Sequence, residues 1–146
     1  MFSEDFIRFL ESRAARKLLP ESVLFYRTKF KELGFDEANS DFVRFWSEYG
    51  DEYYGEEGFI FAFMYELEDI NDSLTAHLRE TLNLPRHYFP LFNLEAEDYL
   101  FYNKNDDSVA LVASENIDSF IESGHADQRW SSFKDFIHHH LGYENH

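Results

Sequence analysis

The spacing of apolar residues predicts three helices within the first fifty residues. Phe6 and Leu10 stand four residues apart, on one face of a helix that must end before Pro20. A second helix is predicted over residues 21–33, because a glycine, typical just beyond a helix C-terminus, follows at position 34. A third, capped near residue 40, carries an apolar stripe with the i, i+3, i+4, i+7 spacing of a core-facing helix. The stripe consists of Phe42, Phe45, Trp46 and Tyr49.

After residue 50 the pattern predicts shorter elements. Residues 51–58, rich in glycine and acid, are expected to form an exposed loop, and the apolar run 59–66 a strand. Further helices are expected at 71–82, 116–123 and 130–141, and strands at 88–94, 99–103 and 108–113, with a turn at 104–107. This order predicts an α+β fold, in which N-terminal helices are followed by a mostly antiparallel sheet with helices packed on one side.

A chain of 146 residues can bury a substantial core without disulfides or metals. We expect an N-terminal helical segment over 1–38 and an α+β domain over 39–146, which together form one compact unit. The chain has no cysteine, and its first residues are acidic where a signal peptide is basic. The longest apolar run, residues 59–65, is far too short to span a membrane. These features predict a cytoplasmic protein.

Negative charge is concentrated after residue 50, and this is the strongest indication of function in the sequence. Residues 1–50 carry 8 Lys and Arg against 9 Asp and Glu, whereas residues 51–146 carry 5 against 20. The acidic part is also rich in Phe, Tyr and Leu, so it can bury enough apolar surface to fold. A folded acidic surface repels nucleic acids and anionic membranes and attracts cations, which predicts a basic protein as the partner.

Three acidic loops are the candidate contact sites. They span 51–57, 95–98 and 106–107, and tyrosines stand within or beside the first two. If the sheet brings their tips together, they form a negative rim that steers a basic partner towards aromatic anchors. Otherwise they are ordinary solubilising loops. The candidate partner-binding residues are Asp51, Glu52, Tyr53, Tyr54, Glu56, Glu57, Glu95, Glu97, Asp98, Tyr99, Asp106 and Asp107.

The sequence contains no recognisable catalytic or metal-binding pattern, so no catalytic residue, metal or cofactor is predicted. His138, His139 and His140 are consecutive, so on a helix they point about 100° apart and cannot share one ion. His125 and Asp127 supply two ligands without further partners. Carboxylates are so frequent that a hydrolase built on clustered acids and His125 stays only an alternative.

A series of segments between residues 41 and 141 forms a pattern of apolar positions and turns. These segments are Phe45-Trp46-Ser47-Glu48-Tyr49-Gly50 at a helix end, Tyr88-Phe89-Pro90-Leu91-Phe92, the meander Tyr99-Leu100-Phe101-Tyr102-Asn103 with Val109-Ala110-Leu111-Val112, and the closing Ser132-Phe133-Lys134-Asp135-Phe136-Ile137. In this pattern the chain resembles a divergent member of the SMI1/KNR4 superfamily, also called SUKH.

The resemblance implies an α+β protein without enzymatic activity. Bacterial members of this superfamily typically act as immunity proteins, which bind and neutralise a cognate toxin that is often a nuclease. Such toxins are commonly basic, in agreement with the acidic composition of this chain. We therefore expect an immunity protein that inhibits a basic toxin without a cofactor. A scaffold or regulatory protein of the same fold, with no toxin involved, is the alternative.

Overall fold

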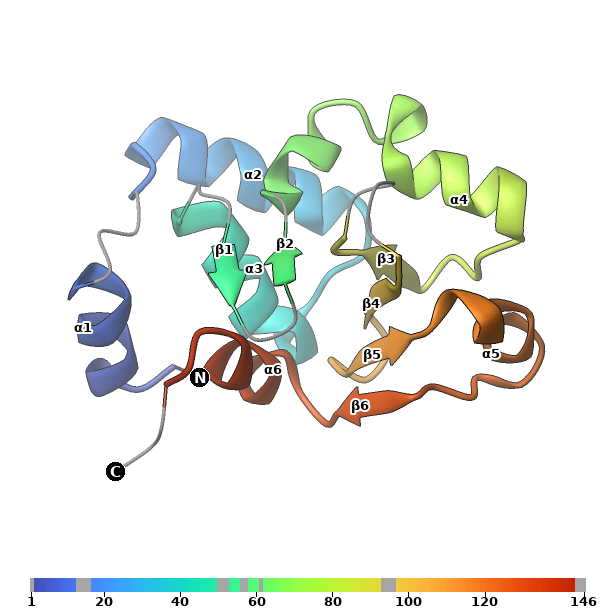
Figure 1. Ribbon diagram of the computed structural model, residues 1–146. Coiled ribbons are helices and arrows are strands. Elements are labelled where there is room, and N and C mark those ends of the chain that lie inside the picture. The colour runs from blue at the N-terminus through green and yellow to red at the C-terminus, as the bar shows by residue number, and fades with distance from the viewer. Residues whose placement is uncertain are drawn as a thin grey trace.

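The computed structural model describes residues 2–12, 17–49, 53–55, 58–60, 62–92 and 97–143, and of residues 53–55, 58 and 59 it describes the backbone. Helices precede a four-stranded antiparallel sheet, so the predicted α+β class is confirmed (Figure 1). The first helices are α1 (Glu4–Ser12), α2 (Pro20–Glu32) and α3 (Ser40–Glu48), and a single 3-10 turn, η1 (Glu37–Asn39), leads into α3.

The main sheet has the strand order β3-β4-β5-β6, and each strand is antiparallel to its neighbour. Its strands are β3 (Tyr88–Pro90), β4 (Tyr99–Asn103), β5 (Val109–Val112) and β6 (Gln128–Trp130). Pro90 lies in the edge strand β3, where a residue without a backbone N–H is tolerated. The remaining elements are α4 (Leu74–Leu82), α5 (Ile117–Ser123), α6 (Phe133–His140) and the 3-10 turns η2 (Phe63–Leu67), η3 (Ile70–Asp72) and η4 (Ser114–Asn116). In the described ranges, no helix combines the length and apolar composition needed to cross a membrane.

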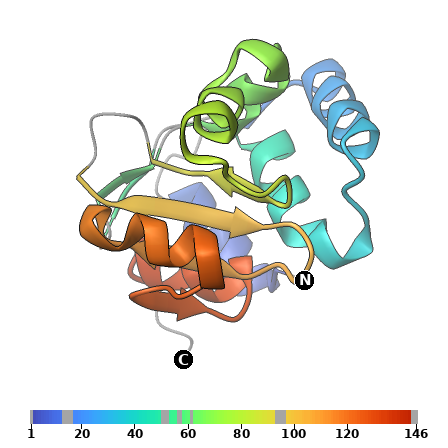
Figure 2. The same ribbon diagram turned by 90° about the vertical axis from the view of Figure 1, so that its right-hand side faces the viewer.

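Side chains of the main sheet alternate between two apolar clusters, one on each face. In β4, Leu100 and Tyr102 join the larger cluster, whereas Tyr99 and Phe101 join the smaller one. The larger cluster contains buried residues of α1, α2, α3 and α6, so the main helical layer lies on one face of the sheet. On the other face, α5 and α4 form a second, thinner layer over the smaller cluster (Figure 2).

The larger cluster joins the N-terminal helices to the sheet. Phe6 of α1, Phe30 of α2 and Phe42 of α3 are almost completely buried in it. The ring of Phe42 stacks on that of Tyr102 in β4, with ring centroids 3.7 Å apart. The helices that precede residue 39 therefore share their core with the sheet. Truncating one of these phenylalanines to Ala would cost about 3–5 kcal/mol.

Local signals set the start of α6 and the end of α2, and the second of these lies where the sequence predicts it. The hydroxyl of Ser132 accepts a hydrogen bond from the N–H of Asp135 and so caps α6. Beyond the end of α2, Gly34 has a φ of +86°, in the left-handed region. The N–H of Phe35 then returns to the carbonyl of Phe30 at 3.1 Å, which closes the last turn.

The apolar run 59–66 does not form the single strand that its composition predicts. β2 (Gly58–Ile60) ends early, and the chain continues into η2. There the buried carboxylate of Glu66 accepts hydrogen bonds from the N–H and the hydroxyl of Thr75, at 2.8 and 2.9 Å, at the start of α4. These bonds satisfy an N–H group in the first turn of α4, which would otherwise lack an acceptor. They hold Glu66 in η2, although the composition of the run 59–66 favours a strand.

Two short strands lie where the sequence predicts a loop and a helix. Within the segment 51–58, β1 (Tyr53–Gly55) pairs with β2 in a separate antiparallel hairpin. Trp130 belongs to β6 and pairs with Val109, so the last helix begins only at Phe133. Each of these strands has 3 residues, too few for an alternating pattern to be visible in the sequence.

Candidate partner-binding surfaces

The main sheet separates two of the predicted acidic loops. Glu97 and Asp98 precede β4, whereas Asp106 and Asp107 follow it in the turn to β5. β4 has 5 residues, so at 3.4 Å per residue the two pairs stand roughly 17 Å apart, at opposite ends of the strand. The sheet therefore does not bring these two loops together into one rim.

The third predicted loop is described only in its backbone and only in part. Tyr53 and Tyr54 lie in β1, within the hairpin formed with β2. Five predicted contact residues lie outside the described residues: Asp51, Glu52, Glu56, Glu57 and Glu95. Their part in binding stays a prediction.

The β4–β5 turn uses its two aspartates to hold its own shape. Asp106 accepts hydrogen bonds from the N–H and the hydroxyl of Ser108, at 3.0 and 2.5 Å. Asp107 has a φ of +65°, and its carboxylate accepts from the hydroxyl of Tyr102 at 2.6 Å and from the N–H of Phe133 at 3.4 Å. Burial raises the pKa of Asp107 to about 6, although both hydrogen bonds favour its ionised form. Asp107 is thus an internal acceptor rather than a free contact group.

The hydroxyl of Tyr102 links this turn to the start of α3. It donates to Asp107 and accepts from Nδ2 of Asn39 at 2.8 Å, and the same Nδ2 donates to the carbonyl of Lys104 at 2.7 Å. Asn39 and Tyr102 are both buried. Burial is the main reason why the pKa of Tyr102 is strongly raised, so the hydroxyl keeps its proton and stays a donor. This network fixes η1, the turn and α6 relative to one another.

A different set of carboxylates gathers around α5, at the other end of β4. Tyr99 pairs with Val112 at the end of β5, so Asp98 lies beside the chain that enters η4 and α5. Tyr99 is half-buried, and its ring stacks on that of Phe101 at 5.6 Å. Between residues 105 and 128 the sequence contains no Lys or Arg. The exposed carboxylates here, which we call the α5 acidic surface, belong to Glu97, Asp98, Glu115, Asp118 and Glu122.

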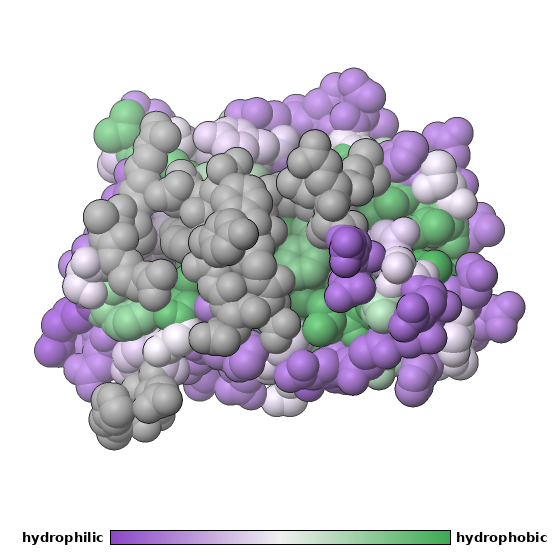
Figure 3. Space-filling view, viewed as in Figure 1, coloured by the Kyte–Doolittle hydropathy of each residue, from purple (hydrophilic) through white to green (hydrophobic). Residues whose placement is uncertain are grey.

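The carboxylates of the α5 acidic surface make no hydrogen bond or ion pair with the described part of the chain. Asp118 and Glu122 stand one helical turn apart, so they repel each other. Glu122 also lies in the last turn of α5, where the helix dipole favours a cation. Hydrophilic residues run along the lower and right-hand edges of the face in Figure 3, where β6 and α5 lie in Figure 1. Of the two acids on α5, Glu122 therefore destabilises the helix, whereas Asp118 lies in the first turn, where the helix dipole favours a negative charge.

The helix beneath this surface is held by both apolar and polar contacts. Phe120 is buried, and its ring stacks on that of Phe101 with centroids 5.2 Å apart. The carboxylate of Asp127 accepts from the N–H of Ala113 at 2.7 Å and from Nδ2 of Asn116 at 2.8 Å, which ties the chain before β6 to η4. These contacts hold the backbone under the acidic side chains in place.

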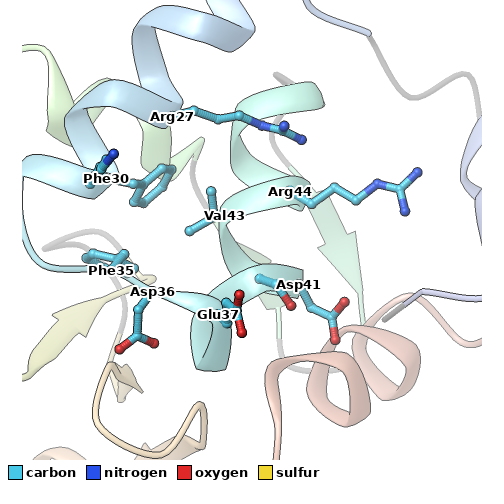
Figure 4. A pocket seen from close by; sticks show the side chains of 10 residues that line it. Arg27, Phe30, Phe35, Asp36, Glu37, Asp41, Val43 and Arg44 are labelled. Atoms are coloured by element: carbon cyan, nitrogen blue, oxygen red, sulfur yellow. The ribbon is translucent and has the colours of Figure 1, made fainter.

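A groove between α2 and α3, which we call the α2–α3 groove, is the second candidate surface (Figure 4). It has a volume of about 700 Å³, and Phe30, Phe35 and Val43 form an apolar floor. Arg27 and Arg44 lie on one side of Val43 in this view, and three carboxylates lie on the other side. The acidic residues are Asp36, Glu37 and Asp41, and the basic ones are Arg27, Lys31 and Arg44.

The two ends of the α2–α3 groove carry opposite charge. Nη2 of Arg27 lies 2.7 Å from Oε2 of Glu48, and Nε of Arg44 lies 3.4 Å from the same oxygen. Two guanidinium groups thus share one carboxylate, which leaves an excess of positive charge. Lys31 is exposed and forms no ion pair with the described residues, so it is a further cation on the α2 wall of the groove.

Comparisons with protein-family models, with curated proteins and with solved structures find no match for this chain. The resemblance to the SMI1/KNR4 superfamily therefore stays a prediction. Function has to be argued from the two surfaces, of which the first is acidic throughout and the second carries both charges.

The histidines and the raised pKa of Asp107 do not point to an active site. Among the described residues, no group of three or more His, Asp and Glu is arranged to hold a metal ion. The ring of His138 packs on that of Phe6, with centroids 4.3 Å apart, and burial lowers the pKa of this histidine. Asp107 is engaged by Tyr102 and Phe133 and does not line the α2–α3 groove. The hydrolase alternative gains no support from these groups.

The sequence-based candidates for acidic contacts lie in loops and do not include the exposed acids on and just before α5. Glu115, Asp118 and Glu122 stand on or just before a helix that the sequence does predict. Two features of the sequence indicate an acidic surface here. Two acids stand four residues apart on that helix, and a stretch of more than twenty residues around it contains no Lys or Arg. The α2–α3 groove left no such signal, because Arg27 and Arg44 become neighbours only through packing.

Proposed function

We propose that this protein is a cytoplasmic immunity protein, which neutralises a cognate basic toxin, such as a nuclease, by forming a stoichiometric complex with it. One observation carries the proposal: the carboxylates of the α5 acidic surface are exposed, and none has a partner in the described part of the chain. In this proposal the protein needs no cofactor and makes and breaks no bonds. Its inhibitory effect comes from covering the surface of the toxin.

The energetic cost of Glu122 near the end of α5 supports a role in binding. The repulsion between Asp118 and Glu122 costs about 0.2–0.5 kcal/mol, and the position of Glu122 near the helix C-terminus costs about 0.3–1 kcal/mol. Residues that serve only solubility could stand elsewhere on the surface without this cost. The attraction of a cationic partner to both carboxylates would offset these two unfavourable terms.

The overall charge supports rapid capture of such a partner. With a net charge of −16, the protein attracts cations at long range, and such steering speeds association by about 10–1000-fold at low salt. Short-range contacts then determine how long the complex lasts. The predicted contact residues at 51–57, which include Tyr53 and Tyr54, would supply aromatic anchors of the kind that dominate interfaces.

A low-salt pull-down with the full chain, followed by co-expression with toxins encoded beside its gene, tests the proposal. We expect a basic protein to be captured and its toxicity to be abolished. A test variant reverses Glu115, Asp118 and Glu122 to Lys, and a control variant reverses Glu11, Glu21 and Glu32, which are exposed on α1 and α2. Both change the net charge equally, yet only the first should lose the partner.

Three outcomes would count against the proposal. A natural partner that is neutral or acidic would remove the role of the acidic surface. Equal losses in the test and control variants would show that only the total charge matters. A captured basic protein that is harmless when produced alone would favour the alternative, a scaffold or regulatory protein with no toxin involved.

A further inference from the structure

We propose that the α2–α3 groove is a second binding site, which takes a short protein segment carrying an apolar side chain between a basic and an acidic residue. The site is separate from the α5 acidic surface and does not depend on the identity of the partner bound there. Its occupant is defined by the apolar floor and by the opposite charges of its two ends.

The segments that form the two rims of the groove are tied to β4 and to the turn that follows it, so the site exists before a ligand arrives. At the end of α2, the carbonyl of Leu33 accepts a hydrogen bond from Nζ of Lys104 at 3.2 Å. At η1, the buried amide of Asn39 donates to Tyr102 and to the carbonyl of Lys104. A preformed groove spares a ligand the entropic cost of ordering its walls.

The charges select a segment of mixed sign. A purely basic segment would be repelled by Lys31 and by the net positive charge of the two arginines that share Glu48. A purely acidic segment would meet the carboxylates of Asp36 and Glu37. A segment with one residue of each sign, spaced around an apolar side chain, satisfies both ends and fills the floor.

The occupant is a segment of another protein rather than a small molecule or a second copy. Leu24 precedes Arg27 by three residues and Lys31 by seven, so it continues the same helix face, and its residue is 68% exposed. A small zwitterion in the groove would leave this leucine uncovered, whereas a protein segment can extend over it. A second copy of the chain would bring two net charges of −16 together, which opposes association.

A titration of the isotope-labelled full chain with three synthetic peptides, followed by NMR, tests the site. The first peptide is an amphipathic dodecapeptide with one Lys and one Glu flanking a leucine. The second carries only Lys and the third only Glu at the charged positions. We expect the mixed peptide to shift the amide resonances of Lys31, Asp41 and Val43 in a saturable way, and the third peptide to leave them unchanged. The Lys peptide is expected to shift resonances of α5 instead, so the two sites report independently.

Charge reversal at Glu37 adds a second test. Glu37 is exposed and makes no side-chain hydrogen bond within the described residues, so Glu37→Lys should fold normally. We expect this substitution to weaken binding of the mixed peptide by about fivefold. A peptide that carries Glu in place of its Lys should bind the variant with the original affinity. The matched control, Glu32→Lys, makes the same charge change on α2 outside the groove and should have little effect.

Several results would contradict the proposal that the α2–α3 groove is a binding site. One is a mixed peptide that leaves the groove resonances unshifted, and another is a Lys peptide that shifts them equally well. Equal weakening by Glu32→Lys would assign the effect to net charge. Groove resonances that depend on protein concentration would show that a second copy occupies the site.

Discussion

Two acidic regions lie at opposite ends of β4, and their carboxylates have different roles in the structure. At the β4–β5 turn, Asp106 and Asp107 accept hydrogen bonds from Ser108, Tyr102 and Phe133, so they hold the chain in place. On the α5 acidic surface, the carboxylates have no partner in the described part of the chain. Acidic composition alone therefore does not locate a binding surface. The hydrogen bonds and ion pairs of each carboxylate separate those that hold the fold from those left exposed to solvent.

Removing one carboxylate from each region should separate the two roles most clearly. Asp107→Ala leaves the hydroxyl of Tyr102 and the N–H of Phe133 without their acceptor, and it places Ala at a φ of +65°. We expect a loss of about 2–3 kcal/mol in the free energy of unfolding. Glu122→Ala should change the same quantity by less than about 0.5 kcal/mol. Urea denaturation followed by circular dichroism measures both, and similar losses would contradict the comparison.

The dependence of stability on pH should carry the signature of Asp107. Its pKa rises from the ordinary value of 3.8 to about 6 in the folded protein, so the folded state binds the proton more tightly than the unfolded chain. The contribution of this group to stability is therefore complete below pH 4 and is lost as the pH rises through 6. With allowance for solvent screening, we expect this loss to amount to about 1–2 kcal/mol.

Asp107→Asn is the control for this prediction, because Asn tolerates the left-handed backbone and does not titrate. Urea denaturation of both proteins at pH 4 and at pH 7 gives the difference in unfolding free energy at each pH. The wild-type protein should lose stability relative to Asp107→Asn between these two values. A difference that stays constant would show that the carboxyl of Asp107 is not perturbed by burial.

The fold could be predicted from the sequence wherever a local signal sets an element. Pro20 and Gly34 delimit α2, and the apolar spacing of α3 places its buried face correctly. Prediction failed where a contact with a residue distant in the sequence determines the secondary structure. The run 59–66 turns into η2 because Glu66 meets the first turn of α4, and Trp130 joins a strand because Val109 pairs with it.

The candidate sites follow the same rule. Glu97 and Asp98 were predicted as contact residues and are exposed, and neither forms a hydrogen bond or ion pair with another described residue. Asp107 was also predicted as a contact residue, but Tyr102 and Phe133 enclose it in the folded chain. Composition can show that acids are numerous, but only packing shows which of them the protein uses for itself.

Two glycines offer a smaller test of how tightly each end of the sheet is packed. Gly34, at the end of α2, and Gly124, at the end of α5, have φ values of +86° and +79°. Replacing either by Ala should cost about 1–2 kcal/mol for the backbone alone. At Gly34 the new Cβ would lie 3.1 Å from Nζ of Lys104, which bonds to Leu33, whereas at Gly124 nothing lies within 4 Å.

We therefore expect Gly34→Ala to be the more destabilising of the two, by about 0.5–1 kcal/mol, the contribution of one hydrogen bond. Midpoints of urea denaturation, measured in parallel, give the difference. If Lys104 simply moves aside without losing stabilisation, the two variants will unfold at the same midpoint, and the two ends of the sheet are equally tolerant of change.

The smallest effect has the opposite sign. Glu122→Lys places a cation one turn after Asp118 and near the C-terminus of α5, so repulsion becomes attraction and the helix dipole is matched. Because Glu122 is exposed and salt screens both interactions at physiological ionic strength, we expect the protein to become more stable by only about 0.5 kcal/mol. Glu122→Gln removes the repulsion without adding the attraction, and should lie between the variant and the wild type.

The same substitution should slow association with a basic partner, most strongly at low salt. Stability and binding would then change in opposite directions at one side chain, as expected of a residue retained for an interaction at the expense of its own helix. If Glu122→Lys instead leaves the unfolding midpoint unchanged, the acids on α5 cost the fold nothing. Their presence would then need no partner to explain it.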